Sequence, residues 1–282
     1  MSITKAIIPV AGYGTRRLPI TKAIEKSMLP VGNRPIVDFA VEDCILAGVK
    51  DIIFVITKTG ERSQIETYYG KNARLEEFLL ARGAEEKLKK LQTAPDDVHF
   101  HFVEQDANDK YGTAVPVALA VKQLGLDEAV AFCNGDDFFY GSKDGSEEKN
   151  LFSALQNDDE AAIIGIRLPK EEIMKFAMIE AGGDGFMTNI VEKPKMEEIT
   201  NDLANINRFV LSRELLKEIV GYVDGNNFSA TEQEYFITDP VLNFVKKGGK
   251  MRVVPATGRF MDCGSLEGWL YANQLVNGLI KE

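Results

Sequence analysis

The feature that most constrains this chain is an apolar run near the N-terminus that leads straight into a glycine turn. Residues 6–10 are short and almost wholly apolar, which is typical of a buried strand. Gly12 and Gly14 follow at once, and glycines allow a backbone to turn tightly and to lie close to a ligand. A buried strand that ends in such a turn indicates a ligand site at the carboxyl end of the strand.

A long basic segment follows the glycine turn. Residues 1–34 contain six lysines and arginines and one acidic residue, Glu25, in a chain whose formal net charge is -10. A dinucleotide-binding fingerprint would need a third glycine at the position of Arg17, and Pro19 and Pro30 disfavour one continuous helix. We therefore expect a proline-punctuated loop that binds phosphate groups.

The order of the expected elements indicates an α/β fold, a Rossmann-like mixed and mainly parallel sheet flanked by helices. Up to residue 133, strands alternate with helices, which is typical of a parallel sheet with helices on both faces. The expected strands are 6–10, 51–56, 98–103, 129–133, 161–168, 175–179, 186–191 and 204–211. The expected helices are 35–47, 60–69, 75–91, 114–124, 213–220, 239–247 and 265–280. No linker rich in Pro, Gly or Ser interrupts this order, so we predict a single domain over residues 1–282.

The composition argues against several classes of protein. A pI near 5.0 disfavours a nucleic-acid binder, which would need a broad basic face. No apolar segment reaches transmembrane length and no signal peptide is evident, so we expect no membrane partner and a cytoplasmic location. The three cysteines, Cys44, Cys133 and Cys263, are odd in number and far apart in sequence, which fits reduced thiols. His99 and His101 share a strand face without a third ligand nearby, and we interpret them as structural.

Acidic residues follow a later expected strand. Asn134, Gly135, Asp136 and Asp137 come directly after residues 129–133, where a Gly-Asp turn is the simplest interpretation. In a chain with a phosphate loop, an acidic pair is also where Mg²⁺ would bind, because magnesium prefers oxygen ligands. A second candidate ligand is Asp262, which lies in Met261-Asp262-Cys263-Gly264.

These motifs together resemble a known family. The basic loop is similar to the signature loop of sugar nucleotidyltransferases, and most similar to that of the bacterial UTP–glucose-1-phosphate uridylyltransferases. The residues that carry this likeness are Gly12-x-Gly14-Thr15-Arg16-x-x-Pro19-x-Thr21-Lys22-x-x-x-Lys26-x-Met28-Leu29-Pro30-Val31. The resemblance covers nearly the whole chain. It implies the nucleotide-diphospho-sugar transferase fold, with a nucleotide-binding half of about 1–140 and a sugar-binding half of about 141–282.

The resemblance also implies a role for individual residues. In Val191-Glu192-Lys193-Pro194, the family's Glu holds sugar hydroxyls and its Lys holds the sugar phosphate. Gln105 matches the glutamine that reads the uracil edge, and Gly112 matches the glycine that lets the backbone approach the nucleotide. The implied catalytic residues are Arg16, Lys26 and Lys193; the nucleotide-binding residues are Ala11, Gly12, Gly14, Thr15, Gln105, Gly112 and Asp136; the sugar-binding residues are Glu192, Lys193, Ala177 and Asn205; and the metal ligands are Asp136 and Asp262.

The implied reaction is transfer of a uridylyl group from UTP to glucose 1-phosphate, assisted by Mg²⁺, in a homodimer or homotetramer. The attacking phosphate is already anionic at pH 7, so the reaction requires no general base, and catalysis should rest on positioning and electrostatics. Arg16 is expected at the leaving phosphates, Lys26 at the nucleotide phosphates and Lys193 at the incoming phosphate.

The chain departs from the family's pattern around the sugar and the base. The departures are Phe176-Ala177 for Tyr-Gly, Glu104-Gln105 for Arg-Gln, residues 107–113 for Glu-Pro-Leu-Gly-Leu-Gly-His, and Glu232-Gln233-Glu234 for Gly-Gly-Glu. The same chemistry with another nucleotide or sugar 1-phosphate, such as thymidylyl transfer, therefore stays open.

Two other classes are weighed against this reaction. A dinucleotide-dependent oxidoreductase should carry an acid after the second strand, where this chain has Thr57-Lys58. A non-catalytic Rossmann-like binding protein would not need the family's basic and acidic residues. All of them are present in this chain, as Arg16, Lys26, Asp136, Lys193 and Asp262.

Overall fold

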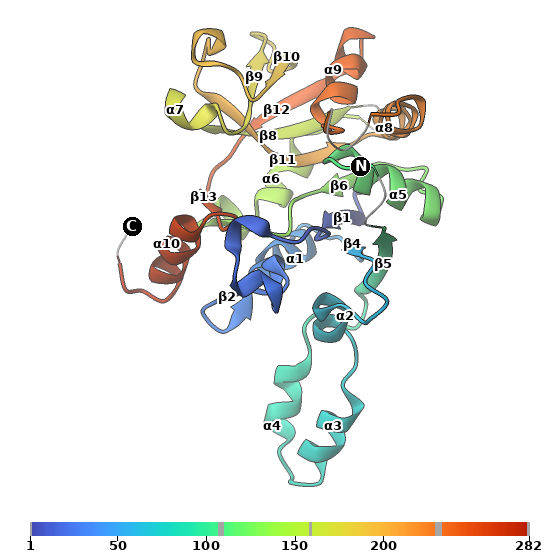
Figure 1. Cartoon of the computed structure of the whole chain (residues 1–282), viewed down its shortest axis with the longest axis vertical. Helices are drawn as coiled ribbons and strands as arrows, with labels where there is room; N and C mark the ends of the chain where they lie inside the picture. The colour runs from blue at the N-terminus through green and yellow to red at the C-terminus, as the bar shows by residue number, and fades with distance from the viewer. Residues whose placement is uncertain (1, 107–109, 158–159, 229–232, 281–282) are drawn as a thin grey trace.

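A mixed sheet organises the molecule, whose computed structural model describes residues 2–106, 110–157, 160–228 and 233–280 (Figure 1). Within these residues nine strands pair in the order β10-β9-β11-β6-β1-β4-β5, with β8 beside β11 and β12 beside β8. The strands are β1 (Lys5–Pro9), β4 (Asp51–Thr57), β5 (His99–Gln105), β6 (Val130–Phe132), β8 (Ala161–Arg167), β9 (Ala177–Ala181), β10 (Met187–Glu192), β11 (Leu203–Leu211) and β12 (Met251–Pro255). Because β11 pairs with β6, the sheet takes strands from both halves of the chain.

The strands of the first half are parallel, as predicted. β1 pairs with β4 on one side and with β6 on the other, and β4 pairs with β5. The mixed character comes from the second half, where β9, β10 and β11 pair in antiparallel fashion. Since parallel strands end at the same edge of a sheet, the glycine turn after β1 and the acidic turn after β6 leave from one edge.

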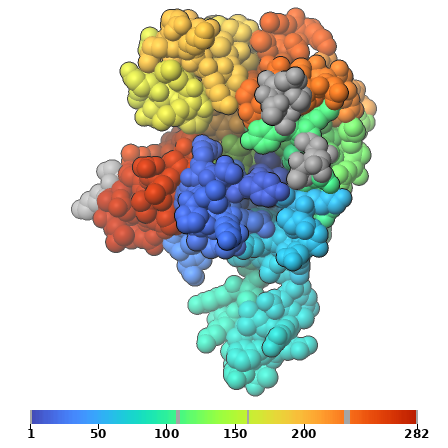
Figure 2. Space-filling view, viewed as in Figure 1, coloured from blue at the N-terminus to red at the C-terminus, as the bar shows by residue number. Residues whose placement is uncertain are grey.

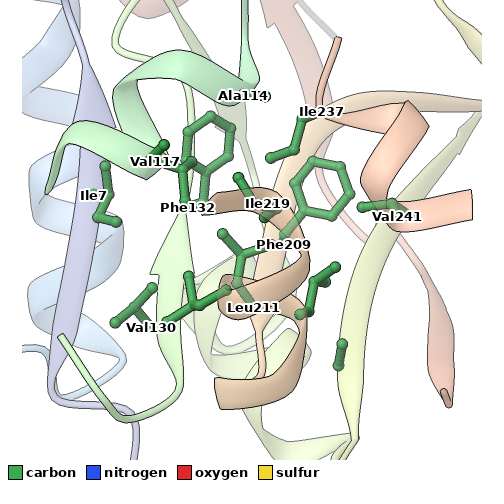
Figure 3. Close-up of a cluster of buried hydrophobic side chains, with 14 of the residues drawn as sticks. Ile7, Ala114, Val117, Val130, Phe132, Phe209, Leu211, Ile219, Ile237 and Val241 are labelled. Atoms are coloured by element: carbon green, nitrogen blue, oxygen red, sulfur yellow. The ribbon is translucent and has the colours of Figure 1, made fainter. Parts of the chain in front are cut away.

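Helices cover both faces of the sheet. Neighbouring residues of a strand point to opposite faces, so Ile7 and Ile8 belong to two different hydrophobic clusters. The larger helices are α1 (Ile36–Leu46), α5 (Ala114–Leu124), α8 (Arg213–Gly225), α9 (Thr238–Lys246) and α10 (Leu266–Val276). Figure 3 shows the cluster beneath α5, α8 and α9, where Phe132 and Phe209 lie on adjacent strands. The other cluster lies between the sheet and α1. No described helix is long and apolar enough to span a membrane.

Residues 73–91 project from the body as a helical hairpin (Figures 1 and 2). The sequence predicts one helix over 75–91, but the structure has α3 (Ala73–Leu80) and α4 (Glu85–Leu88), followed by one 3-10 turn. That prediction is wrong because Gly83 adopts a φ of +60°, in the left-handed region that ends a helix. The preceding helix, α2 (Gln64–Tyr69), begins later than the predicted residue 60, because a capping box at Ser63 fixes its start.

Several short elements go beyond what the sequence pattern predicts. They are β2 (Pro30–Val31), β3 (Arg34–Pro35), β7 (Asp137–Tyr140), β13 (Arg259–Asp262), α6 (Glu147–Ser153) and α7 (Lys170–Ile173), together with β12 of the main sheet. β7 and β13 form an antiparallel pair in which Asp262 lies opposite Asp137. This pairing joins the acidic turn after β6 to a segment more than one hundred residues further along the chain.

Candidate active site

A cavity of about 470 Å³ lies at the carboxyl edge of the parallel strands. Its volume falls within the range of small-molecule sites, roughly 300–1,000 Å³. Its walls come from the glycine turn after β1, the end of β5, the start of α5 and the turn between β6 and β7. The predicted residues that line it are Ala11, Gly12, Gly14, Thr15, Arg16, Lys26, Gln105, Gly112 and Asp136. The structure thus brings together every residue predicted for the nucleotide, from well-separated parts of the chain.

The basic loop folds back onto its own glycine turn. It consists of three 3-10 turns, η1 (Thr15–Arg17), η2 (Ile20–Lys22) and η3 (Lys26–Met28), in agreement with the predicted absence of a continuous helix. Gly14 has a φ of +58°, and a Cβ there would lie 3.0 Å from Thr21 Cγ2 and 3.1 Å from Lys26 Cβ. Thr21 Oγ1 also donates a hydrogen bond of 2.9 Å to the Gly14 carbonyl. A side chain would be both strained and crowded here, and the glycine lets Lys26 lie beside the turn.

Asp136 and Asp262 approach the same point in the site. The β7–β13 pair brings them together, since Asp262 lies opposite the residue that follows Asp136. A Cβ built on Gly264 would lie 3.0 Å from Asp262 Oδ1 and 3.4 Å from Asp136 Oδ2. The Gly264 amide donates a hydrogen bond of 2.9 Å to Asp262 Oδ1. The two predicted metal ligands therefore share one small region of the site.

Lys26 and Asp136 form an ion pair in which Lys26 Nζ lies 2.8 Å from Asp136 Oδ2. Burial opposes ionisation of Asp136, but the positive charges of Lys26 and Arg16 outweigh it and lower the pKa of Asp136 below its ordinary value. The charge of Asp136 in turn raises the pKa of Lys26. Both groups are therefore charged at neutral pH.

Gly112 is constrained by the protein backbone as well as by its place in the cavity wall. Its φ is +138°, and a Cβ there would lie 2.4 Å from the backbone nitrogen and oxygen of Tyr235. The Tyr235 amide donates to the Tyr111 carbonyl at 2.8 Å, and the Ala114 amide donates to the Tyr235 carbonyl at 2.9 Å. The loop that carries Gly112 is thus held by a segment from the second half of the chain.

The predicted sugar-binding residues lie side by side on adjacent strands. Ala177 of β9 is opposite Glu192 of β10 on one side and Asn205 of β11 on the other. Thr238 Oγ1 donates a hydrogen bond of 3.0 Å to Glu192 Oε2. Burial raises the pKa of Glu192 above its ordinary value, although the hydrogen bond from Thr238 acts in the opposite direction.

Lys193 connects this group to the cavity. Its φ of +43° lies in the left-handed region, which is uncommon for a residue other than glycine. Its Nζ lies 3.7 Å from a carboxylate oxygen of Glu234, and Glu234 lines the cavity. The side chain also lies over Phe236, with Nζ 4.5 Å from the ring centroid. In the part of the chain that the structure describes, Glu234 thus joins the two predicted subsites.

Some site residues are not assigned a role from the sequence. Thr57 accepts a hydrogen bond of 3.0 Å from the Gly12 amide, and Thr238 holds Glu192. Thr57 could have been found from the sequence, because it is a polar residue at the end of an expected strand. The contact of Thr238 with Glu192 could not, because it depends on tertiary packing. Of the departures from the family's pattern, residues 107–109 and Glu232 lie outside the described residues.

Both histidines and two of the three cysteines lie outside the lining of the cavity, and only Cys263 belongs to it. His101 Nε2 lies 2.8 Å from Asp51 Oδ1, which agrees with a structural role. All three cysteines are free and buried, and the Sγ atoms of Cys44 and Cys133 are only 3.8 Å apart. Cys44, Cys133 and Glu148 together form a group of three potential metal ligands. However, Arg208 Nη1 donates to Glu148 Oε1 at 2.9 Å, so a buried guanidinium already supplies positive charge there.

An α/β fold in which a basic glycine loop and Asp136 line one cavity is typical of an enzyme that binds nucleotides. The chain matches the nucleotidyl transferase family over residues 5–277 and belongs to that family. This membership confirms that the protein is a nucleotidyltransferase and agrees with the fold predicted from the sequence.

Relatives of known name cover nearly the whole chain. The UTP–glucose-1-phosphate uridylyltransferase of Pseudomonas aeruginosa is 32% identical over 275 residues, which are 96% of this chain and 94% of that protein. A Methanocaldococcus jannaschii protein that bears the same name provisionally is 36% identical over 276 residues, 96% of this chain and 92% of that protein.

Solved structures show the same likeness. A UTP-bound UGPase from Acinetobacter baumannii superimposes with a TM-score of 0.82 at 25% identity, covering 96% of this chain and 92% of that one. A UDP-glucose pyrophosphorylase complexed with UDP-glucose superimposes with a TM-score of 0.80 at 25% identity, covering 99% of this chain and 100% of that one.

Proposed function

We propose that this protein transfers the uridylyl group of UTP to glucose 1-phosphate, which gives UDP-glucose and pyrophosphate. The observation that carries the proposal is the meeting of Arg16, Lys26 and Asp136 in one cavity that Glu234 connects to Lys193 and Glu192. The names of the full-length relatives support UTP and glucose 1-phosphate as the substrates.

The chain's own residues suit a direct displacement. An oxygen of the sugar phosphate forms a bond to the α-phosphorus of UTP, while the bond from that phosphorus to the bridging oxygen of pyrophosphate breaks and the electron pair leaves with pyrophosphate. The nucleophile is already anionic, so the main obstacle is repulsion between two polyanions. Arg16 would bind the leaving phosphates, Lys26 the nucleotide phosphates and Lys193 the incoming phosphate, which lowers this repulsion. Gln105 would read the uracil edge, and Glu192 would hold the sugar hydroxyls.

Nucleotidyltransferases of this family generally use a divalent metal, and we propose that the metal here is Mg²⁺ on Asp136 and Asp262. The donor set fits a hard cation, because two carboxylates approach one point. Magnesium is usually bound by one or two carboxylates together with substrate phosphates, so a pair is sufficient. When bound, the ion would neutralise charge on the phosphates of the substrates.

The wider organisation is proposed on similar grounds. The continuous sheet supports a single domain over 1–282, with a nucleotide-binding half of about 1–140 and a sugar-binding half of about 141–282. Free, buried cysteines support a cytoplasmic location. The resemblance to sugar nucleotidyltransferases supports a homodimer or homotetramer, which light scattering would distinguish from a monomer.

The proposal is tested by pyrophosphate release from a panel of nucleoside triphosphates and sugar 1-phosphates. UTP with glucose 1-phosphate should give UDP-glucose and pyrophosphate in equal amounts. The reverse assay, with labelled pyrophosphate and UDP-glucose, should place the label in UTP. A dehydrogenase or a non-catalytic binding protein would give neither product.

A further inference from the structure

Arg17 differs from its neighbour Arg16 in where its side chain lies. Arg16 is exposed at the cavity, whereas the side chain of Arg17 is buried with only 6% of its surface accessible. Both belong to the 3-10 turn η1, so consecutive arginines leave the same turn in different directions. A buried guanidinium costs free energy unless it finds partners, so the partners of Arg17 indicate what it is for.

Those partners are backbone carbonyls beside Asp262. Arg17 Nη1 donates to the carbonyl oxygens of Cys263 at 3.0 Å and of Ser265 at 2.8 Å. Its guanidinium carbon lies 4.9 Å from the ring centroid of Trp269, in the first turns of α10. Within the described residues no carboxylate forms an ion pair with Arg17. The two hydrogen bonds and the ring contact of its guanidinium all go to residues 263–269.

The same segment carries the proposed metal ligand. The Gly264 amide, between the two carbonyls that Arg17 binds, donates to Asp262 Oδ1 at 2.9 Å. A Cβ on Gly264 would lie 3.4 Å from Asp136 Oδ2 and 3.7 Å from Arg16 Nη2. Arg17 therefore holds one side of this backbone segment while the metal-binding carboxylates and Arg16 meet on the other.

We propose that Arg17 is a positioning residue that joins the phosphate-binding loop to the segment carrying Asp262, and so sets how tightly the site binds its divalent metal. The proposal rests on the proposed function, since it assumes that Asp136 and Asp262 bind that metal. A planar guanidinium can be shared between two carbonyls and stacked on an indole ring at the same time, which a lysine ammonium cannot reproduce. Groups that orient metal ligands from behind typically change metal affinity by about 10–100-fold when they are removed.

Two variants and one matched control test this role. Arg17→Met keeps a long apolar stem but removes the donors, and Arg17→Lys keeps the charge but not the planar fork. Arg167→Met is the control, because Arg167 is an exposed arginine that pairs with Asp202 on the surface. Each protein is measured by pyrophosphate release against Mg²⁺ concentration, by Mn²⁺ binding in the presence of UTP with calorimetry, and by thermal unfolding.

Arg17→Met should raise the Mg²⁺ concentration for half-maximal activity by about tenfold or more, and the Mn²⁺ dissociation constant by a similar factor. At saturating Mg²⁺ its kcat should return to within about threefold of the wild-type value, because Arg17 does not touch the substrates. Arg17→Lys should show a smaller rise, and Arg167→Met none.

Unchanged metal constants with a lower melting temperature would show that Arg17 only stabilises the fold. A loss of kcat that saturating metal does not restore would also overturn the proposal. If Arg17→Met does not fold, Arg17→Lys carries the test, and failure of both to fold would assign Arg17 to folding instead. If the wild-type protein releases no pyrophosphate from any pair, the proposed function fails, while the Mn²⁺ titration still compares the variants.

Discussion

Lys26 Nζ lies 2.8 Å from Asp136 Oδ2, so the lysine proposed for nucleotide phosphates is paired with the aspartate proposed for metal. Each group neutralises the other, and both keep their charge at neutral pH because the pKa of Lys26 is raised and that of Asp136 is lowered. A nucleotide and a metal ion that arrive together would give Lys26 a negatively charged partner and Asp136 a positively charged one, in place of each other. The ion pair thus keeps the two groups ready without leaving either one buried and unpaired.

Because Lys26 is paired with Asp136, replacing Lys26 should affect stability differently from replacing Arg16. Arg16→Ala and Lys26→Ala should each lower kcat by about a hundredfold or more, the usual scale for losing a group that meets charge developing in the reaction. The side chain of Arg16 is exposed, whereas that of Lys26 is only 26% exposed and is paired with Asp136. Steady-state kinetics and thermal unfolding of both variants measure the two effects.

Only Lys26→Ala should also lower the melting temperature, since it leaves Asp136 without its partner. A double variant, Lys26→Ala with Asp136→Asn, should recover part of that loss of stability. Wild-type turnover in either single variant would remove the loop from the mechanism, and equal melting temperatures in the two single variants would show that the pair contributes nothing to stability.

The acidic pair predicts dependence on a divalent metal. EDTA should abolish activity and Mg²⁺ should restore it, because the donors are carboxylates rather than histidines. Asp136→Asn should raise the Mg²⁺ requirement sharply, since it removes a charged ligand. Asp144→Asn, at an acid in a turn outside the cavity, is a suitable control. Full activity of the wild-type protein in metal-free buffer would contradict the assignment of Asp136 and Asp262.

The meeting of the basic loop with Gln105 and Asp136 could be predicted from the sequence. The residues of the basic loop lie within one continuous motif, and the alternation of strands and helices shows that Gln105 and Asp136 follow parallel strands of the same sheet. The ends of such strands meet at one edge, so the sequence is enough to bring these side chains together.

Contacts between distant segments could not be predicted in this way. Nothing in the sequence around Gly112 shows that the Tyr235 backbone fills the space beside it, and nothing around Arg17 shows that it reaches the Cys263 carbonyl. The same holds for Cys44 and Cys133, which are far apart in sequence and yet in contact. Periodicity reports which face of an element is buried, but it does not report what that face packs against.

A buried group of charges predicts an unusual effect of pH on stability. Desolvation raises the pKa of Glu148 to about 8, although Arg208 lowers it and Asp43 raises it further. Between the ordinary value of 4.5 and about 8, the folded protein holds a proton on Glu148 that the unfolded chain has released. Stability falls with rising pH wherever the folded state binds more protons, so the contribution of Glu148 should decrease from about pH 5 to pH 8.

Glu148→Gln tests this directly, because glutamine resembles the protonated acid and can still accept from Arg208. The free energy of unfolding of the variant minus that of the wild-type protein should increase between pH 5 and pH 8, by at most about 1.4 kcal/mol per pH unit. Urea titrations at each pH measure it, with the exposed Glu171→Gln as control. A difference that stays constant over this range would show that Glu148 is ionised throughout.

The last prediction concerns the choice of sugar and base, where the chain departs from its family's pattern. Ala177 lies between Glu192 and Asn205 on adjacent strands and is only 2% exposed, while the neighbouring Phe176 packs edge-on against Phe260. The alanine methyl is therefore buried among the residues that we propose bind the sugar. Glu192, which Thr238 holds in place, remains available for the ring hydroxyls. We therefore expect glucose 1-phosphate to be the best sugar substrate.

A panel of hexose 1-phosphates and nucleotides measures this choice through kcat/KM. A value for another hexose 1-phosphate at least tenfold above that of glucose, or about 1.4 kcal/mol, would overturn the choice of glucose. Ala177→Gly should change KM for the sugar more than KM for UTP, because Ala177 lies among the residues proposed to bind the sugar and not in the wall of the cavity that Arg16 and Lys26 line. UTP should be preferred to dTTP. Gln105→Ala should raise KM for UTP more than KM for the sugar, since Gln105 lines the cavity at the end of β5. A strong preference of the wild-type protein for dTTP would instead place it among the thymidylyltransferases.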